Sequence, residues 1–268
     1  MRMEFVAAQD LDEALAAKAQ QPEAQLLAGG TDLMVGVNLA NHRPSQVIAL
    51  RRIDELRELT PGRIGSGVTW ARLERDVHRG LAEAARTVGS PQIRAAGTIG
   101  GNVGTASPAG DGLPWIAAAD AFIEVRSQAR GTRVVPWREF FIGVKRTSLE
   151  PDEIITAVVV PEGVPVAQEF AKVGVRNAMV IATVSCLVMR GGDGFRIALG
   201  SVATTPMRAT RAEEMLNAES TFTDATLEEV ARVVAEEVRP ITDHRSTEAY
   251  RRYAAGLLAR RLVERSLR

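Results

Sequence analysis

The stretch Leu26-Leu27-Ala28-Gly29-Gly30-Thr31-Asp32-Leu33 is the most informative part of this chain, because a glycine pair directly follows a short apolar run. Glycine adopts positive φ without steric cost and lets another group approach the main chain closely. Successive N–H groups exposed in such a turn form a concavity that binds anions. The stretch therefore predicts a buried strand over residues 25–28 that delivers a phosphate-binding loop.

A second glycine pair occurs further along, in Gly97-Thr98-Ile99-Gly100-Gly101-Asn102-Val103-Gly104-Thr105-Ala106-Ser107-Pro108. It has the same makeup, with glycine beside small hydroxyl and amide residues, and we expect a second loop here. Two such loops match the two phosphates of one dinucleotide. Neither stretch is the Gly-x-Gly-x-x-Gly of a Rossmann fold, which requires a preceding strand, a following helix and an acid downstream.

Composition excludes several classes of protein. The chain has 268 residues, of which 46% are hydrophobic and 25% charged, as in a globular protein with a substantial core. Its 33 basic residues balance 33 acidic ones, so bulk charge indicates neither nucleic acid nor a membrane surface as a partner. We expect no membrane span and no secretory signal, because long apolar runs are missing, and the cytoplasm is the expected compartment.

The residues that most often carry chemistry are sparse. The single cysteine, Cys186, rules out an internal disulfide and a four-cysteine iron–sulfur cluster within this chain. It lies in an apolar run, so we expect a buried small side chain. His42, His78 and His244 are scattered without metal-ligand spacing and are expected at the surface or at helix caps. No nucleophile elbow and no acid–base pair stand out.

The periodicity divides the chain into three parts, residues 1–56, 57–164 and 165–268. In the first part, Asp10 is expected to cap a helix, with Glu13 completing a capping box. The elements predicted for this part are a helix over 11–20, strands over 25–28 and 47–50, and a short helix that begins near 31. In the second part, Thr69 is the expected cap of the first helix. The elements predicted there are strands over 63–68, 122–127, 132–135 and 153–160, and helices over 70–79, 81–87 and 112–120.

The third part reads as three antiparallel strands followed by three helices. The strands are predicted over 169–174, 181–190 and 195–202, and the helices over 208–217, 226–237 and 247–267. Helices and strands that do not alternate strictly indicate an α+β fold. In the last helix one apolar face is expected, made of Tyr250, Tyr253, Ala254, Leu257 and Leu258. Its arginines are predicted to form a solvated face, and a partner-binding surface is the alternative.

The order of the motifs resembles a known family. Ala-Gly-Gly-Thr-Asp-Leu at 28–33, Thr-Ile-Gly-Gly-Asn at 98–102 and Ala-Ser-Pro-Ala-Gly-Asp at 106–111 are similar to the FAD-binding subunit of molybdenum hydroxylases, which include xanthine dehydrogenase and aerobic carbon monoxide dehydrogenase. The resemblance continues through 152–155, 170–172, 206–210 and 243–251. It implies two α+β lobes of the vanillyl-alcohol-oxidase (PCMH) type with FAD between them, then a small domain of three strands and three helices.

The resemblance also implies the residues that would bind FAD. The first loop would hold the diphosphate through N–H groups and the Thr31 hydroxyl, with the Asp32 carboxylate turned away to cap the following turn. Gly101 and Asn102 would lie near the diphosphate, and Gly104 and Thr105 nearer the flavin ring. Asp111 would bond a sugar hydroxyl or serve only as a helix cap, and Lys172 would lie at the flavin's pyrimidine edge or be a solvated strand residue. The complete expected set is Ala28, Gly29, Gly30, Thr31, Asp32, Leu33, Thr98, Gly100, Gly101, Asn102, Gly104, Thr105, Asp111, Ile155 and Lys172.

Two positions depart from the family pattern. Gly104 stands where many relatives carry a larger apolar residue, and Asn38 where relatives often carry a basic one. The function implied is that of an FAD-containing electron-transfer subunit. A large molybdopterin subunit and a small subunit with two 2Fe–2S clusters would be its partners, and NAD, oxygen or a quinone its acceptor. The alternatives are a stand-alone FAD-dependent reductase or oxidase, which needs a substrate base, and a flavin-free scaffold subunit.

Overall fold

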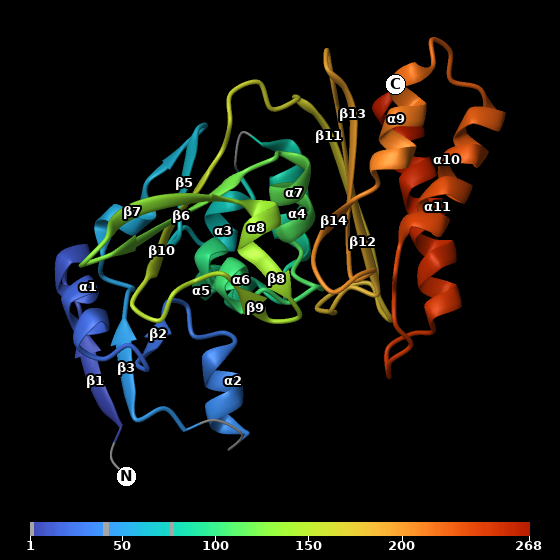
Figure 1. Ribbon diagram of the computed structural model, residues 1–268. Coiled ribbons are helices and arrows are strands. Elements are labelled where there is room, and N and C mark those ends of the chain that lie inside the picture. Colours follow the sequence, from blue (N-terminus) through green and yellow to red (C-terminus); the bar gives the residue numbers. More distant parts are fainter. Residues whose placement is uncertain (1–2, 40–42, 76–77) are drawn as a thin grey trace.

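The computed structural model describes residues 3–39, 43–75 and 78–268 and has the α+β architecture expected from the sequence (Figure 1). An N-terminal lobe, a central lobe and a C-terminal domain follow one another along the chain. The central lobe lies between the other two in Figure 1. Of the three histidines, His42 lies outside the described residues, and His78 occupies the cap position of a helix without a capping hydrogen bond from its side chain.

The N-terminal lobe is a small parallel sheet with one covering helix. Strands β1 (Glu4–Ala7), β3 (Gln46–Ala49) and β2 (Gln25–Leu27) pair in the order β1-β3-β2, and α1 (Leu11–Gln20) packs its buried side chains against them. The short helix α2 (Leu33–Asn38) follows the first glycine motif. Because β2 and β3 run parallel, the first glycine motif and the residues that follow β3 lie at the same edge of the sheet.

The caps of this lobe follow the sequence closely. The Asp10 side chain accepts a hydrogen bond from the Glu13 N–H at 2.8 Å, as predicted. The Glu13 carboxylate reaches back to the N–H of Gln9 at 2.8 Å rather than to that of Asp10. Strand β1 was not predicted, because the run from Met3 to Ala8 is short and carries no turn signal before it.

The central lobe is an antiparallel sheet covered by short helices. Its strands pair in the order β4-β5-β10-β6-β7, which are Leu59–Thr60, Arg63–Gly65, Ile154–Val159, Phe122–Ser127 and Gly131–Pro136. The helices are α3 (Trp70–Leu73), α4 (Arg79–Thr87), α5 (Pro91–Ala96), α6 (Ile99–Thr105), α7 (Leu113–Ala118) and α8 (Trp137–Phe140). A 3₁₀ turn (Asp54–Arg57) leads into the lobe, and a two-stranded ribbon, β8 (Phe141–Gly143) with β9 (Arg146–Thr147), follows α8.

Two predictions for this lobe are wrong in instructive ways. The second glycine motif is not a loop but helix α6, capped by Thr98, whose hydroxyl accepts the N–H of Gly101 at 3.0 Å. The low helix propensity of its three glycines is offset by tertiary packing. The helix predicted over 70–79 ends at Leu73, although Thr69 caps it as expected.

The C-terminal domain is a sheet buried on both faces. Strands β11 (Ala167–Val173), β12 (Val184–Gly191) and β13 (Gly194–Gly200) are antiparallel, and the two-residue strand β14 (Met207–Arg208) extends the predicted set of three. Helices α9 (Thr210–Ala218), α10 (Asp224–Glu237) and α11 (Glu248–Ser266) lie on one side and α4 and α7 on the other (Figure 1). Cys186 and Val188 face α9–α11, whereas Leu187 and Met189 face the central lobe. Cys186 is fully buried, as predicted.

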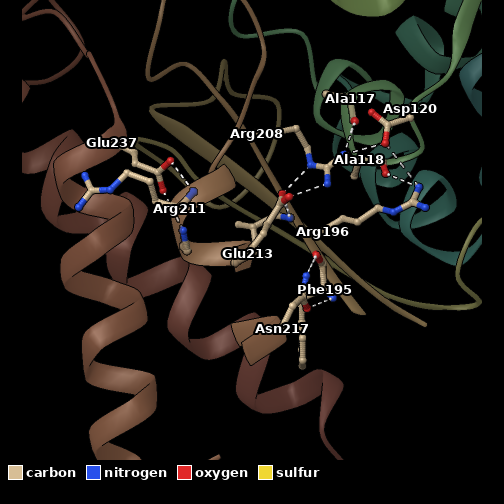
Figure 2. Close-up of polar contacts among 12 residues, drawn as sticks. Ala117, Ala118, Asp120, Phe195, Arg196, Arg208, Arg211, Glu213, Asn217 and Glu237 are labelled. Carbon is tan, nitrogen blue, oxygen red and sulfur yellow. Dashed lines mark hydrogen bonds and ion pairs between the residues drawn. The ribbon is translucent and has the colours of Figure 1, made fainter. Parts of the chain in front are cut away.

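Two arginines join the C-terminal domain to the carboxyl end of α7, as Figure 2 shows. Arg208 donates to both oxygens of Glu213 at 2.5 and 2.6 Å and to Asp120 Oδ2 at 3.0 Å. Arg196 donates to the main-chain oxygen of Ala118 at 3.3 Å. Cations at the carboxyl end of a helix complement its dipole. The family resemblance includes the stretch 206–210 but implies no role for its residues. The structure shows that Arg208 in this stretch joins the C-terminal domain to α7.

The last helix differs from its prediction. Tyr250 and Tyr253 are 48% and 66% exposed, so the predicted apolar face excludes both tyrosines. Arg251 is only 4% exposed and bonds the Thr183 and Ser201 oxygens and Asp243, while Arg252 bonds Glu248. The arginine-rich surface is therefore tied largely into the domain itself and is neither a fully solvated face nor a free basic patch.

Candidate functional site

The two glycine motifs lie against one another in the cleft between the N-terminal and central lobes. A Cβ on Gly29 would lie 2.0 Å from the main-chain oxygen of Ala96, just before the second motif. The Thr105 hydroxyl donates to Asp32 Oδ2 at 3.2 Å. A cavity of about 220 Å³ is lined by Ala28 and Gly29 from one side and by Thr98 from the other. The folding of the chain thus brings the predicted motifs together.

The first motif is a turn that exposes its main-chain N–H groups, as the sequence predicts, and its binding of phosphate stays a prediction. Gly30 has φ +73°, which glycine adopts without strain. The main-chain N–H groups of Gly29, Gly30, Thr31 and Asp32 donate to no acceptor among the described residues. Leu33 follows as the first residue of α2. Four successive free N–H groups provide the donors that an anion requires.

The prediction for the Asp32 side chain is wrong. Asp32 precedes α2, but its carboxylate makes no capping hydrogen bond. The backbone of Asp32 has helical φ and ψ. It accepts the Thr105 hydroxyl instead and thereby links the first motif to the end of α6. The backbone conformation explains the difference, because a capping side chain requires an extended residue.

The second motif offers no comparable run of free N–H groups. Within the protein, the N–H groups of Ile99 and Gly100 donate to Val68 and Ser66 at 3.0 and 2.9 Å. Those of Gly101 and Asn102 donate to the Thr98 hydroxyl and main-chain oxygen at 3.0 and 3.1 Å. The prediction of a second anion-binding turn is therefore wrong, and this motif contributes a surface rather than a ring of donors.

The glycines of α6 differ in the space that a side chain at each position would find. A Cβ on Gly100 would lie 2.5 Å from the Cβ of Ser66, so packing within the protein excludes any side chain there. A Cβ on Gly101 would meet only the Thr98 hydroxyl, at 3.3 Å, and one on Gly104 only the Ile155 side chain, at 3.4 Å. The space in front of Gly101 and Gly104 is therefore not filled by the protein, which suits a flat group lying against the helix.

A buried ion pair joins β11 to the segment that follows the second motif. Lys172 on β11 donates to Asp111 Oδ2 at 2.6 Å, and each side chain is 8% exposed. The Thr87 hydroxyl donates to the same oxygen at 3.3 Å, and its carbonyl accepts from Lys172 at 2.9 Å. Burial raises the pKa of the Asp111 carboxyl to about 6, because desolvation outweighs the attraction of Lys172.

This pair contradicts the alternative interpretations of the two residues, namely Asp111 as a helix cap and Lys172 as a solvated strand residue. Lys172 is not a solvated strand residue, and the cap of α7 is Gly112 rather than Asp111. Thr87, at the end of α4, belongs to the same cluster but had no sequence signal, because threonine at a helix end is common. Only the packing of α4 against β11 brings it there.

Two buried oxygens in this region have no partner within the described protein. They are Asp111 Oδ1 and Asn102 Oδ1. Leaving a polar atom buried without a hydrogen bond is costly, so such atoms point to a missing donor. A group that presents hydroxyl and N–H donors between α6 and α7 would satisfy both. The residues therefore fit FAD, which has ribityl hydroxyls and a polar ring edge.

Ile155 completes the predicted set. It lies on β10 beside Gly104, where the pairing of β10 with β6 is interrupted by a bulge between Ile155 and Ala157. Bulges often occur beside functional sites, where they redirect the main chain.

In the described residues, no cluster of His, Cys, Asp and Glu is arranged to hold a metal ion. No helix in the described ranges is long and apolar enough to cross a membrane.

Comparison with known proteins agrees with this geometry. Residues 1–163 match the family model of the FAD binding domain in molybdopterin dehydrogenase, and residues 169–266 match the CO dehydrogenase flavoprotein C-terminal domain. A xanthine dehydrogenase FAD-binding subunit of Escherichia coli O157:H7 is 31% identical over 96% of this chain and 93% of its own length. The carbon monoxide dehydrogenase medium chain of Hydrogenophaga pseudoflava is 31% identical over 98% and 96%.

A solved structure shows the same fold. The carbon monoxide dehydrogenase of Hydrogenophaga pseudoflava, in a form that lacks the Mo-pyranopterin moiety, superposes with a TM-score of 0.90 at 30% identity, covering 100% of this chain and 98% of the matched one. The fold and the cleft therefore define an FAD-binding oxidoreductase subunit. This chain belongs to the family of FAD-binding subunits of molybdopterin dehydrogenases.

Proposed function

We propose that this chain is the electron-transfer subunit of a molybdenum hydroxylase and that FAD lies in its interlobe cleft. The proposal is carried by the open surface of α6 at Gly101 and Gly104, together with the buried oxygens of Asn102 and Asp111 that lack a partner in the described protein. When bound, FAD accepts electron pairs and passes them on singly or together. A large molybdopterin subunit would oxidise the substrate, and a small subunit with two 2Fe–2S clusters would deliver the electrons.

The chain's own residues have distinct tasks in this proposal. The first loop, Ala28–Leu33 in the sequence, holds the diphosphate through its free N–H groups. Gly101 and Gly104 admit the cofactor to the helix surface, and Ile155 lies against it beside Gly104. Asp111 accepts a hydroxyl, and Lys172 supplies positive charge near the flavin, which favours its reduced anionic form.

The acceptor follows less directly from this site. NAD, oxygen and a quinone each accept electrons from flavins, and each is a candidate.

The stand-alone reductase or oxidase remains the second hypothesis. In the described part of the chain, the carboxylates and the lysine named at the cleft are the paired Asp111 and Lys172 and the hydrogen-bonded Asp32, so none of them is a free substrate base. The flavin-free scaffold is disfavoured by the match to an FAD binding domain.

Purification tests the proposal in two steps. The chain expressed alone should carry non-covalent FAD that acid precipitation releases as a yellow supernatant, and artificial donors should reduce it without hydroxylase activity. Co-expressed with its neighbouring genes, it should copurify with a pterin-binding chain and a cluster-binding chain. A colourless chain that takes up no FAD on reconstitution would refute the flavin site, and flavin without copurifying chains would favour the stand-alone enzyme.

FAD affinity is expected to depend on pH through Asp111. Its carboxyl pKa of about 6 in the flavin-free protein should fall when a ribityl hydroxyl donates to the unpartnered Oδ1. Binding is then coupled to loss of a proton, so the dissociation constant should rise by up to about tenfold from pH 7 to pH 5 and be constant above pH 7. Fluorescence titration checks this. In Asp111→Asn the profile should be flat, and tighter binding at pH 5 would contradict the assignment.

A further inference from the structure

The predicted site has a charge deficit. The stretch 28–38, which contains the first glycine loop and α2, has no lysine or arginine and one carboxylate, Asp32. The stretch 98–111 likewise has no basic residue and contains Asp111. Lys172 is already paired with Asp111. A diphosphate brings two further negative charges, so main-chain N–H groups alone would have to balance them.

Two arginines stand next to the first loop. Arg51 and Arg52 follow β3 after one intervening residue, and β3 pairs in parallel with β2, so both arginines emerge at the same sheet edge as Gly29 and Gly30. The N–H of Leu50 donates to the Leu27 oxygen at 2.9 Å, which holds the two segments side by side. Parallel strands place whatever follows them at a common edge, where ligands bind.

The cavities on both sides of Gly29 contain these arginines and no acid. The cavity of about 220 Å³ between the lobes is lined by Arg51 and Arg57, and a neighbouring cavity of about 360 Å³ by Arg51 and Arg52. Ala28 and Gly29 border both. None of the lining residues is aspartate or glutamate. The charged side chains that line the two cavities bordering the first loop are therefore all cationic.

Arg51 is also uncommitted. Within the described part of the chain, its guanidinium makes no hydrogen bond or ion pair, and the same holds for Arg52. Arg57, in contrast, is bound to Asp54 and donates to the Arg51 main-chain oxygen, so it supports the backbone of this segment. An arginine fork pairs well with phosphate oxygens, because its N–H groups match them in geometry.

We infer that Arg51 and Arg52 bind the diphosphate of FAD at the first glycine loop and supply the positive charge that both glycine motifs lack. The inference deepens the proposed function and rests on it. Arg51 is the principal ligand, because it borders both cavities, and Arg52 adds charge from one side. The N–H groups of Gly29–Asp32 and the arginines then approach the phosphates from adjacent segments of one sheet edge.

Binding titrations of the full chain, freed of flavin, test the inference. Riboflavin, FMN and FAD carry none, one and two phosphates, and ADP carries a diphosphate without flavin. We expect Arg51→Gln to weaken FAD roughly tenfold and the double variant with Arg52→Gln to weaken it roughly 100-fold. ADP, measured by competition, should weaken by the same factors, and riboflavin should not change. Arg51→Lys should recover part of the loss.

Salt and a matched control separate charge from folding. The dependence of FAD affinity on ionic strength should be shallower in Arg51→Gln, because fewer charges meet on binding. Arg261 is an exposed arginine on α11 that pairs with no other described residue, so Arg261→Gln should bind FAD like the wild type. Unchanged FAD and ADP affinity in the double variant, or an equal loss for riboflavin, would overturn the inference while leaving the FAD site intact. A wild-type chain that binds no FAD would overturn the proposed function itself, and this inference with it.

Discussion

Replacing Gly101 with valine is expected to leave a folded chain that no longer binds FAD. Gly101 lies in the first turn of α6, and a Cβ there would meet only the Thr98 hydroxyl, at 3.3 Å, and otherwise project into space that the protein leaves open. Valine is no worse than glycine in a helix, so the free energy of unfolding should change by less than about 1 kcal/mol. The branched side chain would fill the cradle, and FAD affinity should fall by more than roughly 100-fold.

Flavin content after reconstitution and urea unfolding of the flavin-free chain measure the two parts of this result. Gly192→Val serves as the control, because Gly192 lies in the β12–β13 turn with no atom within 4 Å of its added Cβ. Gly30→Val is a poorer test, since φ +73° there makes any side chain strained. A Gly101→Val chain with full flavin content would show that FAD does not lie against α6.

Replacing Lys172 with glutamine is expected to destabilise the flavin-free chain by about 3 kcal/mol at pH 8, because it leaves the Asp111 carboxylate buried without its cation. The sign of the pH dependence follows from the raised pKa of Asp111, about 6 in the wild type and higher without Lys172. At pH 5 Asp111 binds a proton, the unpaired charge disappears, and the destabilisation should shrink. Urea unfolding at both pH values measures the difference.

A double variant separates the ion pair from simple packing. Lys172→Gln combined with Asp111→Asn removes both charges, and most of the lost stability should return at pH 8. Lys145→Gln, at an exposed lysine, provides the control and should change the free energy of unfolding little. An equal loss at pH 5 and pH 8, with no recovery in the double variant, would mean that Lys172 acts through its aliphatic chain rather than its charge.

Local sequence predicted much of the architecture. Caps at Asp10 and Thr69 and the apolar runs of β11, β12 and β13 are decided by residues close to one another in the chain. Such features depend on propensity and pattern, which short stretches carry. The positive φ of Gly30 and the run of free N–H groups after it likewise follow from one short motif.

Predictions failed where a residue's partner lies far along the chain. The glycines of the second motif looked like a turn, yet Ser66 and Val68 accept its N–H groups and hold it as a helix. Arg251 looked like a surface residue on a basic helix, yet Thr183 and Ser201 bury it. Hydrogen-bond acceptors supplied by distant segments leave no trace in the local pattern.

The sequence by itself determined the family, the order of the motifs and the two glycine motifs that meet in the cleft. Only the tertiary structure decided what those residues do there. It assigned Asp32 to Thr105, paired Asp111 with Lys172 and set Arg51 beside Gly29. The physical reason is that charge, burial and hydrogen bonding depend on distances between side chains, and these distances are set when the lobes and the C-terminal sheet pack together.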